Sequence, residues 1–472
     1  MVQREPTRYA SYAAVRNRRL LAEAMSWHRL KLTTATACIV LGLSACSGAT
    51  EVTADGRQLP TVEFLALDRK GQNLAVYDAF WHQLLTNYYD PRVFATDEWR
   101  ARRTRWREEA AKAETRFVLY HSSFHRLLQF MPESHVQVHA PEGGSNTDAP
   151  PKSPPLDDKT ATLLASLVFI HGPGFLSADV MRSGTRRNLV AEVWPHSPAA
   201  EAGVQPGARL LRSQANADRT AKVVRFEVDF VPLDAAAAHA WERGELADQP
   251  AAPESIVRAR YDLRPFPYRQ PVEVRRLAGG VQYLRFNGFG DTEFMKPVYK
   301  AIDDAKPAGL IIDLRSNGGG LQEQLQKFAG ALLGAGAHIA ETRVRSGPGK
   351  LLATAYEKSY TGPLVVLAGP ATGSAAEVFA AAVQDLKRGK VIGRSTAGAV
   401  LGARGFALPD GGIVTLPVFD LWRAGGKRIE GTGVEPDIWI LPTIEDVRAG
   451  HDPVIERALQ EIARRGMGSD GR

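Results

Sequence analysis

The 472-residue sequence predicts a multidomain protein that combines α+β and α/β architecture. Apolar residues recur at helical spacing between residues 76 and 130, which indicates a small helical domain. From residue 281 to residue 391, runs typical of buried strands alternate with helical patterns. Such alternation favours a layered α/β core. The chain is long enough for two or three domains, each with its own hydrophobic core.

The charge of the chain is concentrated at its N-terminus. The formal net charge is +7, but residues 1–45 hold seven Arg or Lys against two Glu. The rest of the chain carries 52 basic and 50 acidic side chains. Because no basic stripe remains outside the first 45 residues, the sequence does not favour a nucleic-acid partner.

The N-terminal excess of positive charge is typical of a targeting segment. Residues 25–46 hold two basic residues and then a mostly apolar run, too short for a mature membrane span, that ends in Leu43-Ser44-Ala45-Cys46. This ending resembles a bacterial lipobox, so we expect a lipoprotein signal peptide and a lipid anchor on Cys46. The alternative is a plain secretory signal with a chance cysteine at its end. Residues 1–24 do not fit a signal sequence and are interpreted as an upstream extension.

The targeting segment predicts an exported protein that is anchored to a bacterial membrane on the periplasmic or cell-surface side. The only other cysteine, Cys38, lies inside the predicted signal, so no disulfide is expected. The fold must then rest on its hydrophobic cores. Residues 47–65 are interpreted as a linker between the anchor and the body of the protein.

Residues 66–141 are predicted to form the N-terminal helical domain. Its helical patterns are broken at Asp90-Pro91, and Ser134 and His135 follow the last of them, just before a short predicted strand. A histidine in such a place is by itself most often a structural or surface residue. Residues 142–159 are rich in Pro, Gly, Ser and Asp and are interpreted as a second linker.

A third domain is predicted for residues 160–265. It contains the turn His-Gly-Pro-Gly-Phe at residues 171–175 and later the stretch Ser-Pro-Ala-Ala-Glu-Ala-Gly-Val. These motifs resemble a PDZ domain, a β fold that binds the C-terminal end of a peptide. The resemblance implies that the carboxylate of such a peptide is held by the turn residues Gly172, Gly174 and Phe175.

Two features of this domain depart from the PDZ pattern. Where PDZ domains usually have Gly-Asp and an apolar strand, this chain has Gly207-Ala208-Arg209. Residues 233–254 have the composition of an inserted excursion. The alternative interpretation is therefore a PDZ fold that is kept for packing and binds no peptide.

Residues 266–445 are predicted to form the α/β core, which contains two glycine turns. The first, residues 316–320, follows a buried-strand run and holds three glycines that permit positive φ and a close approach of the backbone. The second places Ser374 between another strand run and a helical pattern. A serine there can present its hydroxyl beside free backbone N–H groups. Ser374 with Glu377 is equally a capping box, which requires no catalysis.

Three stretches of the core together resemble peptidase family S41, which includes the C-terminal processing proteases and the tricorn core. They are Leu-Ile-Ile-Asp-Leu-Arg-x-Asn-x-Gly-Gly, Gly-Ser-Ala-Ala-Glu, and Val-Ile-Gly-x-x-Thr-Ala-Gly. The resemblance implies a crotonase-like ββα spiral with Ser374 as the nucleophile. It also implies an oxyanion hole formed by the backbone N–H groups of Ala375 and of Gly318 or Gly319.

The catalytic base departs from the pattern of the processing proteases. In that branch a lysine follows the Thr-x-Gly motif, whereas here the motif is followed by Ala399. The resemblance then favours the tricorn-like branch, which implies His135 as the base and Ser134 and Glu430 as the other members of a Ser-His-Ser-Glu tetrad. Alternatively, Glu430 is a turn carboxylate that holds backbone N–H groups.

Two function classes follow from these patterns. The first is a serine endopeptidase that cleaves unfolded or C-terminally recognised polypeptides outside the cytoplasm. The second is a catalytically inactive, PDZ-type peptide-binding lipoprotein. Only the first requires Ser374 and His135 to meet, and Lys390 and Lys427 are the rival bases. We expect no cofactor and no metal, and residues 446–472 are predicted to form a C-terminal helix.

Overall fold

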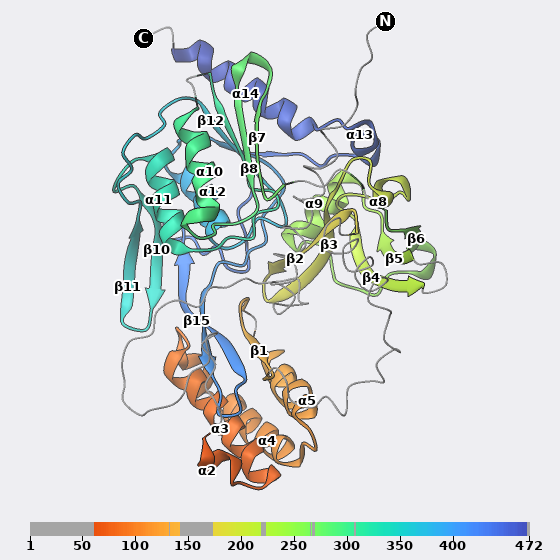
Figure 1. The fold of residues 1–472 in the computed structure, drawn as a ribbon, viewed down its shortest axis with the longest axis vertical. Helices are drawn as coiled ribbons and strands as arrows, with labels where there is room; N and C mark the ends of the chain where they lie inside the picture. The colour runs from red at the N-terminus through yellow and green to blue at the C-terminus, as the bar shows by residue number, and fades with distance from the viewer. Residues whose placement is uncertain are drawn as a thin grey trace, which may run out of the picture. The chain divides into compact units, whose positions relative to one another are not determined.

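The computed structural model describes most of the chain beyond residue 60. The described ranges are 61–131, 133–141, 173–218, 223–264, 266, 270–305 and 308–469. The predicted leader with Cys46, the linker at 142–159 and Gly172 of the predicted peptide-binding turn lie outside these ranges. All described residues belong to one compact unit (Figure 1).

The helical domain is built around a cluster of aromatic side chains. Phe80 and Phe124 stack with ring centroids 4.6 Å apart, and Trp81 meets Phe94 edge-on. The first helix begins inside residues expected to be linker. The segments of the domain are α2 (Val62–Leu65), α3 (Arg69–Asn87), η1 (Pro91–Ala95), α4 (Asp97–Lys112), α5 (Arg116–Val118), the π-helical turn η2 (Leu119–His125), α6 (Arg126–Leu128) and the short strand β1 (Gln137–His139).

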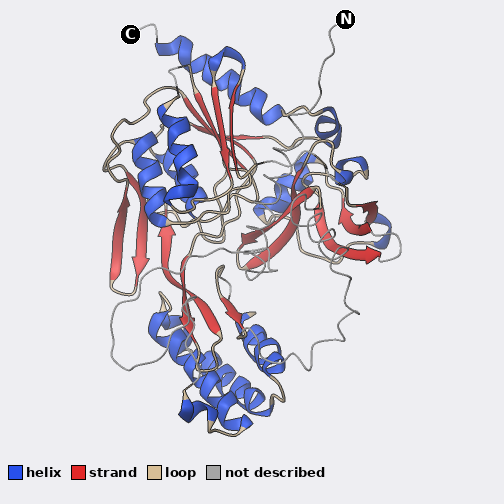
Figure 2. Ribbon diagram, in the orientation of Figure 1, coloured by secondary structure: helices blue, strands red, loops and turns tan. Residues whose placement is uncertain are grey.

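A hairpin from the core enters the helical domain. Strands β14 (Gly402–Ala407) and β15 (Ile413–Trp422) form this hairpin, and β1 pairs antiparallel with β15. Leu408, Val414 and Leu416 are fully buried in the same cluster as the aromatic residues of the helices. Figure 2 shows these strands in red among the blue helices. The pairing of β1 fixes the place of the residues just before it, Ser134 and His135.

Residues 173–264 form a five-stranded antiparallel module in which the strands pair in the order β2-β3-β4-β5-β6. The helix α9 packs on this sheet, because Trp241 is buried against side chains of the first two strands. The first half of the stretch 233–254, interpreted as an inserted excursion, thus contains the helix α9, and this helix packs on the module. Its segments are β2 (Phe175–Arg182), β3 (Thr185–Val193), α8 (Pro198–Glu201), β4 (Arg209–Asp218), β5 (Val223–Val231), α9 (Ala235–Arg243), η4 (Pro253–Ser255) and β6 (Val257–Asp262).

The core is a six-stranded sheet in the order β16-β13-β12-β9-β8-β7, parallel except for the edge strand β7. Helices α10, α11 and α12 cover one face and α14 covers the other (Figure 1). The segments are β7 (Val272–Arg276), η5 (Ala278–Gly280), β8 (Gln282–Phe286), α10 (Thr292–Asp303), β9 (Leu310–Asp313), α11 (Gln322–Leu333), β12 (Leu364–Ala368), α12 (Ala375–Asp385), β13 (Lys390–Gly393) and β16 (Ile438–Trp439).

The remaining segments complete the edges of the core. A second hairpin, β10 (His338–Val344) and β11 (Gly347–Leu352), pairs with β15. The chain continues through α13 (Ile444–Ala449) to α14 (Pro453–Ser469), so a helix forms where the sequence predicts one. In the described part of the chain, none of the helices has the length and apolar character that a membrane crossing requires.

The hairpin that enters the helical domain gives a first prediction. Leu416→Ala should lower the free energy of unfolding by about 2–5 kcal/mol, because the side chain is fully buried in the shared cluster. Leu352→Ala, whose side chain is 43% exposed on β11, should change it by no more than about 0.5 kcal/mol. Urea unfolding followed by circular dichroism measures both. Equal losses would mean that β15 does not pack into the domain.

Candidate active site

Ser374 lies in the turn between β12 and α12, as the sequence predicts. Its backbone has φ 50° and ψ −122°, a conformation that non-glycine residues rarely adopt. The residue is partly exposed, and its N–H is donated to Ala399 O at 2.9 Å. Backbone strain of this kind persists where the surrounding structure enforces it, and it is common at active sites.

Glu377 connects this turn to the segment that follows β13. Its carboxylate accepts the N–H groups of Ser374, Gly398 and Ala399 and the hydroxyl of Thr396. The glutamate half of the predicted capping box is therefore formed. Burial raises the pKa of Glu377, and the hydrogen bonds from Thr396, Ala399 and Gly398 and the nearby charge of Arg182 oppose that effect. The sequence identified Glu377 only as a cap, because its contacts with residues 396–399 leave no local pattern.

The first glycine turn lies directly against Ser374. Gly319 has φ 98°, and a Cβ atom there would meet Ser374 Cβ at 2.5 Å and Gly373 O at 2.8 Å. Only glycine fits such a close approach of two turns. The N–H of Gly319 is donated to Asn317 Oδ1 at 2.9 Å, so it is already occupied.

Two other backbone donors remain beside Ser374. Within the described part of the chain, neither the N–H of Gly318 nor that of Ala375 is donated to a protein acceptor. Gly318 is exposed, and Ala375 is the first residue of α12. Of the two glycines expected at an oxyanion hole, the geometry leaves Gly318 as the available partner of Ala375.

Ser134, His135 and Glu430 form a continuous chain of hydrogen bonds. Ser134 donates its N–H to Glu430 Oε1 at 2.7 Å and its hydroxyl to Glu430 Oε2 at 3.0 Å. The same hydroxyl lies 2.5 Å from Nδ1 of His135. His135 also has a positive φ, 64°. Nδ1 is thereby engaged, which leaves Nε2 as the ring nitrogen for another partner.

The two halves of the site are connected through residues 399 and 400. Ala399 O accepts the N–H of Ser374, and Val400 donates its N–H to Glu430 Oε2 at 2.7 Å. Among the hydrogen bonds of the described residues, none joins the Ser374 hydroxyl to His135. The predicted site residues thus lie around residues 399 and 400. Direct hydrogen bonds join three of them, Ser134, His135 and Glu430.

The electrostatics of the site follow from its burial. Burial, together with the nearby Arg186 guanidinium, lowers the pKa of His135 to about 4. Burial raises the pKa of Glu430 to about 7, although the hydrogen bonds from Ser134 and Val400 oppose this shift. At neutral pH His135 is therefore uncharged and able to accept a proton.

The rival base Lys390 lies at the start of β13 and is engaged elsewhere. Its Nζ atom is 3.0 Å from Asp437 Oδ1, and its side chain is 43% exposed. The ammonium group of Lys390 is therefore engaged in an ion pair on the surface of the core.

Two residues of the predicted peptide-binding turn are described. Gly174 has φ 85°, and its carbonyl accepts the hydroxyl of Ser197 at 3.0 Å. The side chain of Phe175 is buried in the core of the module. Both residues shape the start of β2.

The far end of β2 reaches the candidate site, which the sequence did not reveal. Met181 donates its N–H to Ala397 O at 2.6 Å, and the buried guanidinium of Arg182 donates to the carbonyl oxygens of Thr396 and Ala397. Ser183 donates its N–H to Gly431 O at 3.1 Å. The module therefore contacts both segments that surround Ser374 and Glu430.

His121 and His125 have the four-residue spacing of helical metal ligands, so an absence of this spacing cannot support the expectation of no metal. They lie in the π-helical turn η2 with ring centroids 5.8 Å apart. In the described ranges, no three His, Cys, Asp or Glu side chains are arranged to hold a metal ion.

The close approach of the glycine turn gives a second prediction. Gly319→Ala should destabilise the protein by about 2 kcal/mol or more, since the new methyl group meets backbone atoms on both sides and the positive φ is strained. Gly318→Ala should cost far less, because a Cβ atom at that position meets no atom within 4 Å. Thermal unfolding compares the two variants. Equal stability would disprove the packing of the two turns.

Comparisons with known proteins match the core. Residues 280–440 match the model of peptidase family S41. Over 156 residues, the chain is 32% identical to tricorn protease homolog 1 of Streptomyces coelicolor. The aligned residues make up 32% of this chain and 14% of that protein. Over 165 residues, it is 30% identical to the carboxy-terminal processing protease CtpA of Bacillus subtilis. This alignment covers 33% of this chain and 35% of that protein. The chain thus aligns with well under two thirds of either relative.

A solved structure has the same overall arrangement. The photosystem II D1 C-terminal processing protease matches with a TM-score of 0.52 and 20% identity, over 78% of this chain and 93% of that one. At this identity the likeness concerns the fold, a mixed α/β multidomain arrangement. The region matched by the family model contains both glycine turns, Ser374 and Glu430. The match to peptidase family S41 thus falls on the part of the chain that holds the candidate nucleophile.

Proposed function

We propose that this protein is a serine endopeptidase that hydrolyses peptide bonds in unfolded or C-terminally recognised polypeptides. The observation that carries the proposal is the gathering of separate chain segments at residues 399 and 400. Ala399 O accepts the N–H of Ser374, and Val400 donates its N–H to Glu430. Glu430 is in turn hydrogen-bonded to Ser134, whose hydroxyl contacts His135. The family of the core supports the same reaction class.

In the proposed reaction, the Ser374 hydroxyl attacks the carbonyl carbon of the scissile peptide bond while Nε2 of His135 takes its proton. The oxyanion that forms accepts hydrogen bonds from the N–H groups of Gly318 and Ala375. Collapse of the tetrahedral intermediate releases the amine with the proton from His135. A water molecule then cleaves the acyl-enzyme by the same steps, and the Ser374 hydroxyl is restored.

Ser134 and Glu430 act as orienting groups in this scheme. The hydrogen bond between the Ser134 hydroxyl and Nδ1 fixes the ring of His135, and Glu430 fixes Ser134 by accepting both of its donors. When His135 becomes positively charged, the acceptor chain to Glu430 stabilises that charge. Ala399, which stands where the processing proteases have lysine, contributes only its backbone groups.

The five-stranded module is proposed to be a PDZ-like domain that binds the C-terminal end of a polypeptide substrate beside β2. The hydrogen bonds of Met181 and Arg182 with residues 396 and 397 support a functional link between this strand and the site. The core is proposed to be the crotonase-like spiral of the family. For the N-terminus we propose export and a lipid anchor on Cys46.

The alternative is an inactive peptide-binding lipoprotein. It is favoured by one observation: among the described residues, no hydrogen bond joins the Ser374 hydroxyl to His135. In apo structures catalytic hydrogen bonds are often long and tighten only with substrate bound, so this does not exclude the peptidase.

The test that separates the two functions is the variant Ser374→Ala. It should abolish hydrolysis of an unfolded protein substrate, because the nucleophile is removed. The melting temperature should stay within a few degrees, since the loss of a capping side chain costs about 0.5–2 kcal/mol. Release of soluble peptides measures the activity. Unchanged turnover by the variant would reject the peptidase.

The pH dependence tests the assignment of the base. Because burial lowers the pKa of His135 to about 4, kcat/KM should fall as the pH drops through about 4, where the imidazole becomes protonated. An exposed histidine would produce the same fall near its ordinary pKa of about 6.5. His135→Ala should lower kcat by about 10⁴-fold or more.

Lys390→Ala is the matched control for the base, since it removes the rival ammonium group and breaks only the surface ion pair with Asp437. It should change kcat by less than about tenfold, as expected for an exposed pair. An active His135→Ala variant beside an inactive Lys390→Ala variant would overturn the tetrad and leave Ser374 as the nucleophile.

A further inference from the structure

A buried ion pair connects the five-stranded module to the core. Glu242 on α9 accepts from Nε of Arg394, the residue just after β13, at 2.6 Å, and Nη2 of Arg394 lies 2.5 Å from the same oxygen. The two side chains are only 1% and 4% exposed. Arg394 also donates its backbone N–H to Ala368 O at the end of β12. The pair therefore joins α9 to two central strands of the sheet.

Both side chains of the pair have further hydrogen-bond partners, although Nη2 of Arg394 is buried without one. Arg394 donates Nη1–H to Ala191 O on β3 at 2.8 Å, and Trp439 donates its indole N–H to Glu242 Oε2 at 3.1 Å. Two charges in an interior are tolerated only with such partners, and apolar residues in their place are often as stable or more so. Because apolar residues would serve stability equally well, we expect Glu242 and Arg394 to have another role.

The chain that follows Arg394 leads directly to the candidate site. We call residues 394–400 the 394–400 segment. Each of its residues after Arg394 is held by a hydrogen bond, and the last four reach Thr372, Glu377, Ser374 and Glu430. An unbroken series of hydrogen-bonded residues therefore leads from Arg394 to the candidate site.

From this arrangement we propose that Glu242 is a positioning residue for the candidate active site. It acts through Arg394, which fixes the start of the 394–400 segment. The far end of this segment holds the carbonyl of Ala399, which accepts the Ser374 N–H, and the N–H of Val400, which is donated to Glu430. The inference rests on the proposed function for its effect on hydrolysis. Its effect on the segment itself does not depend on that function.

A second contact of α9 supports the same role. The ring of His239 stacks on Trp439 with centroids 4.6 Å apart, and its Nε2 lies 2.5 Å from Glu435 Oε1. Glu435 in turn accepts the hydroxyl of Ser395, the second residue of the segment, at 2.7 Å. One helix of the module thus holds the first two residues of the 394–400 segment.

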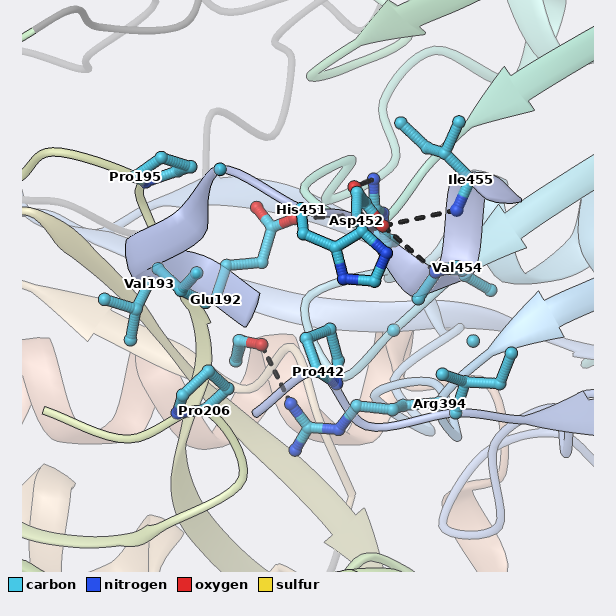
Figure 3. Close-up of a pocket in the computed structure, with 18 of the residues that line it drawn as sticks. Glu192, Val193, Pro195, Pro206, Arg394, Pro442, His451, Asp452, Val454 and Ile455 are labelled. Atoms are coloured by element: carbon cyan, nitrogen blue, oxygen red, sulfur yellow. Dashed lines mark hydrogen bonds and ion pairs between the residues drawn. The ribbon is translucent and has the colours of Figure 1, made fainter. Parts of the chain in front are cut away.

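Arg394 also lies in the wall of a cavity. The cavity has a volume of about 320 Å³, and Arg394, Pro442 and Gly369 contribute to its wall (Figure 3). Packing alone does not confine the side chain on this side. Without the carboxylate of Glu242, the guanidinium of Arg394 would keep its bond to Ala191 O but would lose its charged partner.

The test is the isosteric variant Glu242→Gln, compared with the wild-type full-length protein. Hydrogen exchange of the backbone N–H groups of residues 396–400 should become faster, since they lose the anchor at Arg394. On a short peptide with an amidated C-terminus, kcat should fall by about tenfold with KM unchanged. Unchanged exchange in this variant would overturn the proposal.

The matched control is Arg448→Met, which loosens the module without touching the 394–400 segment. Arg448 lies on α13 and donates to the carbonyl oxygens of Ala200 and Glu201 on α8. Exchange at residues 396–400 should remain at the wild-type rate. If it rose as much as in Glu242→Gln, attachment of the module in general would be responsible, and the proposal would be overturned.

A double variant guards against simple unfolding. Glu242→Leu with Arg394→Met removes both charges and should keep the melting temperature close to that of the wild type. Exchange at residues 396–400 should stay fast and kcat low. Recovery of both would show that the pair supplies stability only, which contradicts the positioning role.

The two proposals can fail separately. A wild-type protein that hydrolyses no peptide rejects the proposed function, and the exchange measurements still decide the role of Glu242. An active wild type with equal exchange in all variants rejects the role of Glu242 alone.

Discussion

The buried carboxylate of Glu377 accepts four hydrogen bonds from two separate parts of the chain. One donor is the N–H of Ser374, and the others belong to residues 396–399. An ionised carboxylate in an interior is costly unless its oxygens are saturated by donors. The turn of Ser374 and the segment after β13 therefore cannot separate without exposing an unsatisfied charge. Because Val400 follows at once and holds Glu430, this one side chain determines where the candidate nucleophile lies relative to the rest of the site.

The sequence predicts well those features that have a local cause. Apolar runs and glycines identify β9 and β12 and the two turns that follow them, and in the structure the first turn lies against Ser374 of the second. It predicts poorly where a weak local pattern is decided by packing. The composition of residues 233–254 indicates an inserted excursion, but it does not indicate that Trp241 is buried against the sheet of the module.

Contacts between distant parts of the chain could not be predicted from the residues alone. Ser134 and Glu430 are separated by 296 positions, and no periodicity or spacing connects them. The hairpin of β14 and β15 gives no sign in the sequence that its core lies in the helical domain. Glu377 illustrates the limit most clearly, because the sequence predicts its capping bond to Ser374 but not its bonds to residues 396–399.

The pairing of β1 with β15 also has a consequence for the order of events during biosynthesis. A chain that leaves the ribosome or a secretion channel N-terminus first exposes His135 long before β15 and Glu430 exist. Contacts of such large sequence separation form late in folding, because a long loop must close first. The proposed peptidase would therefore remain harmless to itself and to neighbouring nascent polypeptides until nearly all of it has been made. In this topology the order of synthesis therefore delays the proposed proteolytic activity until the chain is nearly complete.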